Sequence, residues 1–163
     1  MRRLGGSRLH SCILIFPLLV ALGACGGDSD EGEPLLSGSL TAEYDGNAFT
    51  PVNGFATTSD GIGLIVLGDG PVRCGSEDDT EPPAGRNAAV TLPALEVGSH
   101  TSVFVQMFQN VGDFEGVGSN QGTLELTSVS QEAVAGSISF DYVDDEGRQF
   151  RLDGDFEVVR CAP

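Results

Sequence analysis

Several residue types are scarce or missing in this chain of 163 residues. It contains no tryptophan and no lysine, and only two tyrosines and two histidines. Without lysine, a hydrolase of the serine–lysine type is excluded. The lack of tryptophan and the shortage of tyrosine also argue against a glycosidase, whose cleft needs aromatic rings that hold the sugar as well as a pair of carboxylates.

Motifs of the common enzyme classes are missing as well. The nucleophile motif Gly-x-Ser-x-Gly does not occur, and Gly61, Gly63 and Gly68 bracket an apolar run instead of leading into a helix, as a dinucleotide site requires. A zinc site needs several histidines or cysteines, which His100 alone does not provide. We therefore predict a non-enzymatic protein with no catalytic residues, no metal ligands and no cofactor, and expect His100 to be a surface residue at the start of a strand.

The charge is strongly one-sided. All eight basic residues are arginines, against 24 Asp and Glu, which gives a formal net charge of −16. A field of this sign repels nucleic-acid phosphates, so no nucleic-acid partner is expected. The acidity is consistent with cation binding, with a basic partner, or simply with a solvated surface.

The N-terminus has the order of a secretory signal peptide. Three arginines within the first eight residues precede an apolar run at 12–22, which is shorter than the roughly 20 residues that span a bilayer. The tetrapeptide Leu22-Gly23-Ala24-Cys25 follows, and it resembles the lipobox of bacterial lipoproteins. The alternative is that Cys25 is only the last residue of an ordinary signal peptide.

The lipobox resemblance implies a lipid anchor and a location. In such proteins the leader is removed and the cysteine carries more than one acyl chain, which holds a protein firmly on a membrane. Gly26 stands where an aspartate would resemble an inner-membrane retention signal, so the outer membrane is favoured, with the domain facing the periplasm or the cell surface. We predict a signal peptide at 1–24, a flexible tether at 25–36 and one folded domain at 37–163. The mature chain would keep five arginines against 24 acidic residues, a formal charge of −19.

The cysteines of the folded part form one pair. Cys12 leaves with the leader and Cys25 takes lipid, so Cys74 and Cys161 remain. An even pair in an exported protein indicates a disulfide, because the compartment is oxidising. The competing explanation, a metal or catalytic thiol pair, lacks neighbouring histidines.

Short alternating segments separated by glycine-rich turns predict an all-β domain. We expect an antiparallel β-sandwich, with a small β-barrel as the alternative, and two long loops at 68–87 and 109–121. In the segment 102–108, Phe104 and Phe108 have the parity opposite to Val103 and Val105. If the phenylalanine side is uncovered, it becomes a partner site. Strands are expected at 39–44, 48–52, 62–67, 88–92, 102–108, 123–129, 134–142 and 149–158.

The folded part also resembles a group of uncharacterised small bacterial lipoproteins. The resemblance lies in an Asp-Gly turn between the first two strands and in the segments 122–126, 134–140 and 154–158. It covers most of residues 37–161, although the Cys74 loop is long for the group and Cys161 has no counterpart in it. The resemblance implies the fold and the location but no activity.

Acidic clusters are the remaining chemical feature. Asp141, Asp144, Asp145 and Glu146 lie around one expected hairpin, and a second cluster lies at 77–81. Calcium prefers such oxygen ligands, but the spacing is not that of an EF-hand. We expect a lipid-anchored, non-enzymatic envelope protein that binds an unknown protein or glycan and is a monomer. The alternative is a calcium-assisted adhesion or carbohydrate-binding module.

Overall fold

The structure, a computed structural model, describes residues 36–72, 74, 84–111 and 113–162. They lie in one compact unit, Gly32–Pro163. The predicted signal peptide, Cys25, nearly all of the predicted tether and the acidic residues 77–81 lie outside the described residues. Within the described residues, no helix is long and apolar enough to cross a membrane.

The described residues form ten strands connected in one sheet. In chain order these are β1 (Ser37–Gly38), β2 (Thr41–Tyr44), β3 (Asn47–Phe49), β4 (Asn53–Ser59), β5 (Ile62–Gly68), β6 (Gly85–Leu92), β7 (Gly98–Val111), β8 (Asp113–Val129), β9 (Ala133–Val143) and β10 (Gln149–Arg160).

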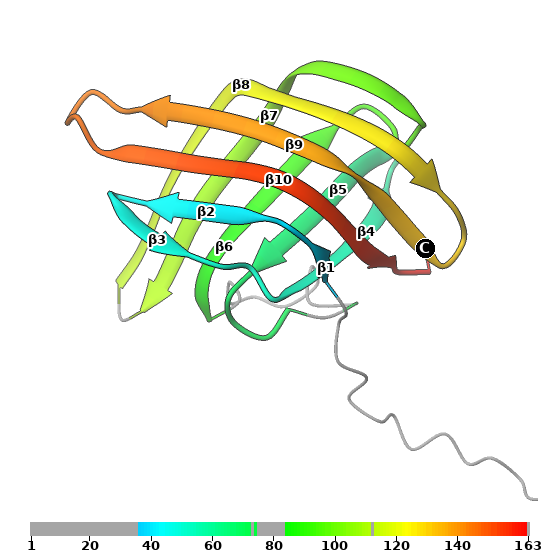
Figure 1. Cartoon of the computed structure of the whole chain (residues 1–163), viewed down its shortest axis with the longest axis horizontal. Coiled ribbons are helices and arrows are strands. Elements are labelled where there is room, and N and C mark those ends of the chain that lie inside the picture. The colour runs from blue at the N-terminus through cyan, green and yellow to red at the C-terminus, as the bar shows by residue number, and fades with distance from the viewer. Residues whose placement is uncertain (1–35, 73, 75–83, 112, 163) are drawn as a thin grey trace, which may run out of the picture. The chain divides into compact units, whose positions relative to one another are not determined.

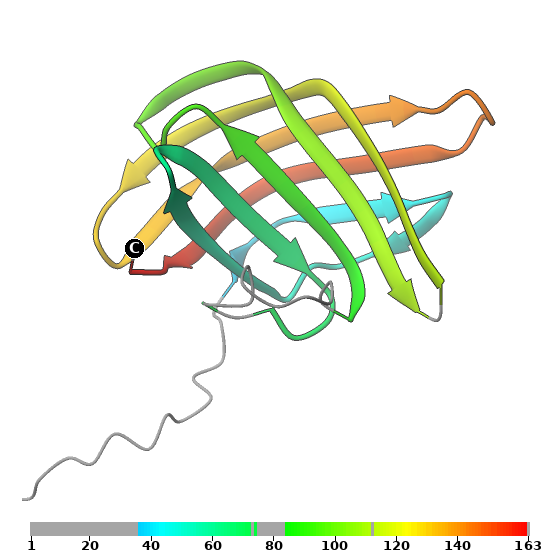
Figure 2. The ribbon, with the colours of Figure 1, turned by 180° about the vertical axis from the view of Figure 1, so that it is seen from behind.

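Seven of these strands, β4 to β10, close into a barrel. Consecutive strands pair antiparallel from β4 round to β10. The ring closes because the end of β10 runs parallel to β4, with Val159 opposite Phe55. The β2–β3 hairpin and β1 are attached through β10. Figures 1 and 2 show β9, β10 and β2 in one wall and β5, β6 and β7 in the opposite wall.

The predicted all-β class is therefore confirmed, and the strand order supports the barrel alternative rather than specifically a sandwich. A strand in either architecture has one face toward the core and one toward solvent. The alternation of side chains is consequently the same in both. Only the pairing of β10 with β4, two segments about a hundred residues apart in sequence, distinguishes them.

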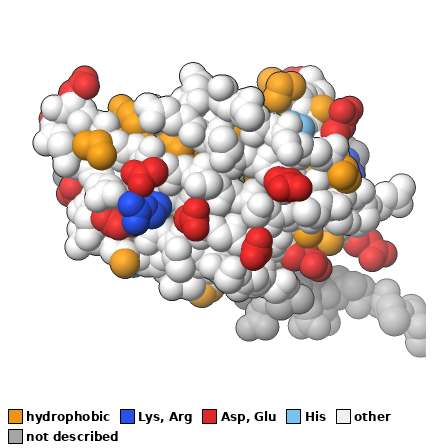
Figure 3. Space-filling view, turned by 45° about the horizontal axis from the view of Figure 1, so that its top comes forward, with side chains coloured by type: hydrophobic (Ala, Val, Ile, Leu, Met, Phe, Trp, Pro, Cys, Tyr) orange, Lys and Arg blue, Asp and Glu red, His pale blue; other side chains and the backbone are white. Residues whose placement is uncertain are grey.

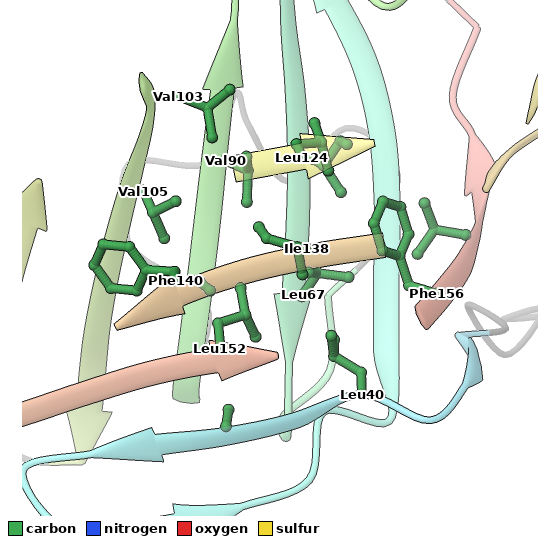
Figure 4. Packing of buried hydrophobic residues seen from close by; sticks show 14 of the residues in the cluster. Leu40, Leu67, Val90, Val103, Val105, Leu124, Ile138, Phe140, Leu152 and Phe156 are labelled. Atoms are coloured by element: carbon green, nitrogen blue, oxygen red, sulfur yellow. The ribbon is translucent and has the colours of Figure 1, made fainter. Parts of the chain in front are cut away.

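Hydrophobic side chains from both walls fill the barrel. The alternation predicted for the last two strands is confirmed, since Phe150, Leu152, Phe156 and Val158 are buried and the acidic residues between them are exposed. Figure 4 shows Ile138 and other side chains of this wall meeting Leu67 and Val90 of the opposite wall. Burial of this set supplies the main stabilisation of the fold.

The apolar run at 62–67 becomes β5, which is covered on both faces over most of its length. Ile65 and Leu67 belong to the barrel core. The outward-facing side is covered by a second, smaller cluster that consists of Phe55, Val66, Val72 and Cys161. This double coverage explains why the segment is continuously apolar instead of alternating.

The predicted pairing of Cys74 with Cys161 is present as a disulfide, with the two Cα atoms 5.4 Å apart. Cys161 follows β10 and is buried in the small outer cluster, whereas Cys74 lies in the connection between β5 and β6. The bond therefore joins that connection to the C-terminal end of the chain.

Three expectations about the strands are wrong. The predicted loop at 109–121 lies almost entirely in β7 and β8, whose continuous pairing accommodates the glycines there. The sequence pattern also does not predict β4, because its residues 54–57 are all buried and do not alternate. The strand expected at 48–52 ends at Phe49 as β3, since Pro51 cannot donate to a sheet ladder. The Asp45-Gly46 hairpin is confirmed, with both φ angles positive at 50° and 73°.

Candidate functional site

The pairing of β7 with β8 is interrupted twice within a few residues. The first irregularity inserts Ser102 into β7, between the paired residues Thr101 and Val103, and the second inserts an extra residue into β8 near Asn120. Ser102 has a φ of 58°, in the left-handed region that is uncommon for residues other than glycine. Bulges of this kind redirect side chains and are over-represented beside functional sites.

A groove of about 520 Å³ lies at these bulges, and we call it the bulge groove. Its volume falls within the roughly 300–1,000 Å³ of typical ligand sites. Two large hydrophobic side chains are exposed in it, Ile62 at 50% and Phe104 at 38%. The groove is lined by Ile62, Thr91, Leu92, Pro93, His100, Thr101, Ser102, Val103, Phe104 and Asn120.

The two phenylalanines of β7 have different surroundings, which answers the question that the sequence left open. Phe108 is only 8% exposed, whereas Phe104 is exposed in the bulge groove. The ring of Phe104 reaches Gly118 on β8, where an added Cβ would lie 2.6 Å from the ring's Cζ. Gly118 therefore makes room for the ring, which lies against the neighbouring strand and keeps part of its surface in solvent.

His100 lies in the third position of β7, close to where the sequence pattern predicts it. It is half-buried, and its Nε2 atom is 2.9 Å from the backbone oxygen of Glu96. In Figure 3 the pale blue histidine is seen with both hydrophobic and acidic side chains around it. A second hollow of about 230 Å³, which we call the side hollow, shares His100 and Thr101 with the bulge groove.

The acidic hairpin at 144–147 has a structural role. The carboxylate of Asp144 accepts hydrogen bonds from the backbone N–H groups of Glu146 and Arg148 and lies 2.7 Å from the Arg148 guanidinium. Asp141 is paired with Arg151 on the next strand at 2.8 Å. Among the described residues, no three His, Cys, Asp or Glu side chains lie close enough together to hold a metal ion. The other predicted acidic cluster, at 77–81, lies outside them.

These contacts set the titration of Asp144. Burial alone would raise the pKa of the carboxyl, but hydrogen bonds from the Arg148 backbone and side chain and from the Glu146 backbone outweigh burial, so the pKa lies below its usual value. A depressed pKa means that the ionised group stabilises the fold above the unfolded pKa of about 3.9 and that this contribution is lost as the pH falls through the folded pKa.

We therefore expect Asp144→Asn to destabilise the protein more at pH 7 than at about pH 2. Urea unfolding midpoints at the two pH values measure this difference. Asp145→Asn is the matched control, since it removes a neighbouring exposed carboxylate. An equal loss of stability at both pH values would show that the charge of Asp144 is not what holds the turn.

Sequence patterns indicated Phe104 and His100 as separate features, and they gave no sign that Ile62, Ser102 and Asn120 belong to one site with them. The only available signal was that β7 is apolar on both faces. The bulges that assemble the groove leave no pattern in the residues, because they depend on the register of β7 against β8.

Comparisons with known proteins show no relative. The chain matches no family model, and neither the curated proteins nor the solved structures include a significant match to it.

Proposed function

We propose that this chain is a lipid-anchored, non-enzymatic binding module of the bacterial cell envelope, with the bulge groove as its binding surface. The observation that carries the proposal is the groove itself, in which Phe104 and Ile62 are exposed at a double bulge. Exposed aromatic and aliphatic side chains that line one groove are the kind of apolar surface that ligand sites use.

The resemblance of 22–25 to a lipobox supports the anchor, and acyl chains on Cys25 would attach the protein to a membrane. Gly26, at the position after the lipid-bearing cysteine, favours the outer membrane. The Cys74–Cys161 disulfide supports export, because such bonds persist in oxidising compartments. The net charge, −16 for the whole chain and −19 without the leader, supports a monomer that repels nucleic acid and other copies of itself. Within the described residues the calcium alternative has no support, since the carboxylate of Asp144 is already engaged with Arg148 and the turn backbone.

We expect Cys25→Ser to move the protein from the membrane fraction to the soluble fraction when the full chain is expressed in a bacterium. The thiol is the attachment point for the lipid, and one substitution removes it. Cell fractionation measures the shift, and mass spectrometry of the wild-type N-terminal peptide measures the acyl groups.

Gly26→Ala is the control for this test, because it changes the adjacent residue and leaves the thiol in place. An unmodified N-terminus in the wild-type protein, or a serine variant that stays with the membrane, would contradict the anchor.

A further inference from the structure

We infer that the bulge groove binds a neutral carbohydrate, with the ring of Phe104 as the platform for one sugar. The inference rests on the proposed function and names the ligand class of the same site. It is carried by the exposed aromatic ring, by the uncharged polar residues that line the groove with it and by the adjacent side hollow, which shares two lining residues with the groove.

The far end of the ring lies against β8, and 38% of the residue's surface stays exposed. Phe104 reaches across to Gly118, and a Cβ at that position would collide with the far end of the ring. The ring is therefore positioned before a ligand arrives, which lowers the ordering cost of binding. A pyranose presents C–H groups on its face and hydroxyls around its edge, so its face is complementary to an aromatic surface with polar neighbours.

The polar side chains around Phe104 are of the required kind. Thr91, Thr101, Ser102 and Asn120 line the groove and carry hydroxyl or amide groups, which both donate and accept hydrogen bonds. None of the lining residues is acidic or a permanent cation, and His100 is the one titratable group among them.

This charge pattern selects for an uncharged ligand. An anion would be repelled by the mature chain, whose formal net charge is −19. A cation would be bound best by several carboxylates, whereas the bulge groove has none and the adjacent side hollow has only that of Glu125. A neutral molecule that is rich in hydroxyls is not repelled by the negative charge and does not need carboxylate ligands.

The side hollow extends the site beyond a single sugar. It shares the lining residues His100 and Thr101 with the bulge groove. Its other lining residues include Ser99, Thr123 and Ser139, which carry hydroxyl groups, and the acidic Glu125. Two adjoining shallow hollows suit an oligomer that lies along the surface better than a monosaccharide enclosed in a cavity.

Calorimetric titration of the full-length, acylated protein tests the inference, in a detergent without a sugar headgroup. The probes are cellohexaose, chitohexaose and maltohexaose, with the disaccharide of each. We expect one or more of the hexasaccharides to bind, with a dissociation constant at least tenfold lower than that of the corresponding disaccharide. Absence of binding by all three at 10 mM, or equal affinities for hexamer and dimer, would overturn the inference.

Substitutions locate the binding. Phe104→Ala is expected to weaken binding at least tenfold, Phe104→Tyr to preserve it, and Gly118→Ala to weaken it by displacing the ring. Val143→Ala is the control, since it removes an exposed hydrophobic residue of β9 that does not line the groove. Unchanged affinity in Phe104→Ala would place the sugar elsewhere and overturn the assignment. Because acylation of Cys25 is measured separately, failure of sugar binding leaves the anchor standing.

Discussion

Replacement of Phe150 by alanine is expected to lower the free energy of unfolding by about 3–5 kcal/mol, the usual cost of removing a buried aromatic side chain. Phe150 is fully buried in β10, where its ring meets Tyr44 edge-on with centroids 5.0 Å apart and lies 6.3 Å from the ring of Tyr142. Its removal leaves a cavity in the barrel core beside the rings of Tyr44 and Tyr142. Urea unfolding of the purified protein measures the change.

Two matched substitutions keep this prediction testable. Phe150→Leu retains most of the apolar volume and is expected to cost less than the alanine variant. Phe104→Ala removes the same side chain from an exposed position and is expected to cost about 1 kcal/mol or less. Since domains of this size are stable by only about 5–15 kcal/mol, the leucine variant gives a measurable value even if the alanine variant does not fold. Equal losses at positions 104 and 150 would contradict the assignment of Phe150 to the core.

Loss of the Cys74–Cys161 disulfide is expected to destabilise the protein by about 2–5 kcal/mol, the typical cost of removing a native disulfide. The bond spans 87 residues of sequence, and the chain-entropy account gives a closed loop of this length about 4.5 kcal/mol. It also holds the buried Cys161 in the outer cluster with Phe55, Val66 and Val72. Reduction is therefore expected to loosen the cover on the outer face of β4 and β5.

Thermal unfolding of the wild-type protein with and without reductant measures this contribution. The double variant Cys74→Ser/Cys161→Ser is expected to melt at the temperature of the reduced wild type and to be insensitive to reductant. A melting temperature of the wild type that does not respond to reductant would contradict a stabilising role for the bond.

The fold was predictable from the sequence where one side of a strand faces the core and the other faces water. β9 and β10 show this, because buried side chains such as Phe140 in β9 and Phe150 in β10 alternate along each strand with small, polar or charged residues. It was not predictable where both sides are covered. β4 has four consecutive buried residues, and its outer side is covered by a cluster that includes Cys161, about a hundred residues later in the chain.

The candidate site was predictable only in part. Phe104 stood out because it has the opposite parity to Val103 and Val105, but Phe108 shares that parity and is buried. The two rings are distinguished by what lies over them, which local sequence does not contain. The glycines at 116 and 118 indicated a loop, yet Gly118 lies in β8 and accommodates the ring of Phe104.

The sequence by itself determined the all-β class, the hairpin turns, the alternation of the last two strands and the pairing of Cys74 with Cys161. These follow from interactions between near neighbours, from the period of two in a strand and from cysteine count. Only the tertiary structure decided that the sheet closes by pairing of β10 with β4 and that the Asp144 carboxylate accepts hydrogen bonds within its own turn. It also decided that Phe104 and Ile62 are exposed in the same groove. Each of these depends on strand register and on contacts between distant segments, and a one-residue change in register would send every side chain of a strand to the other face.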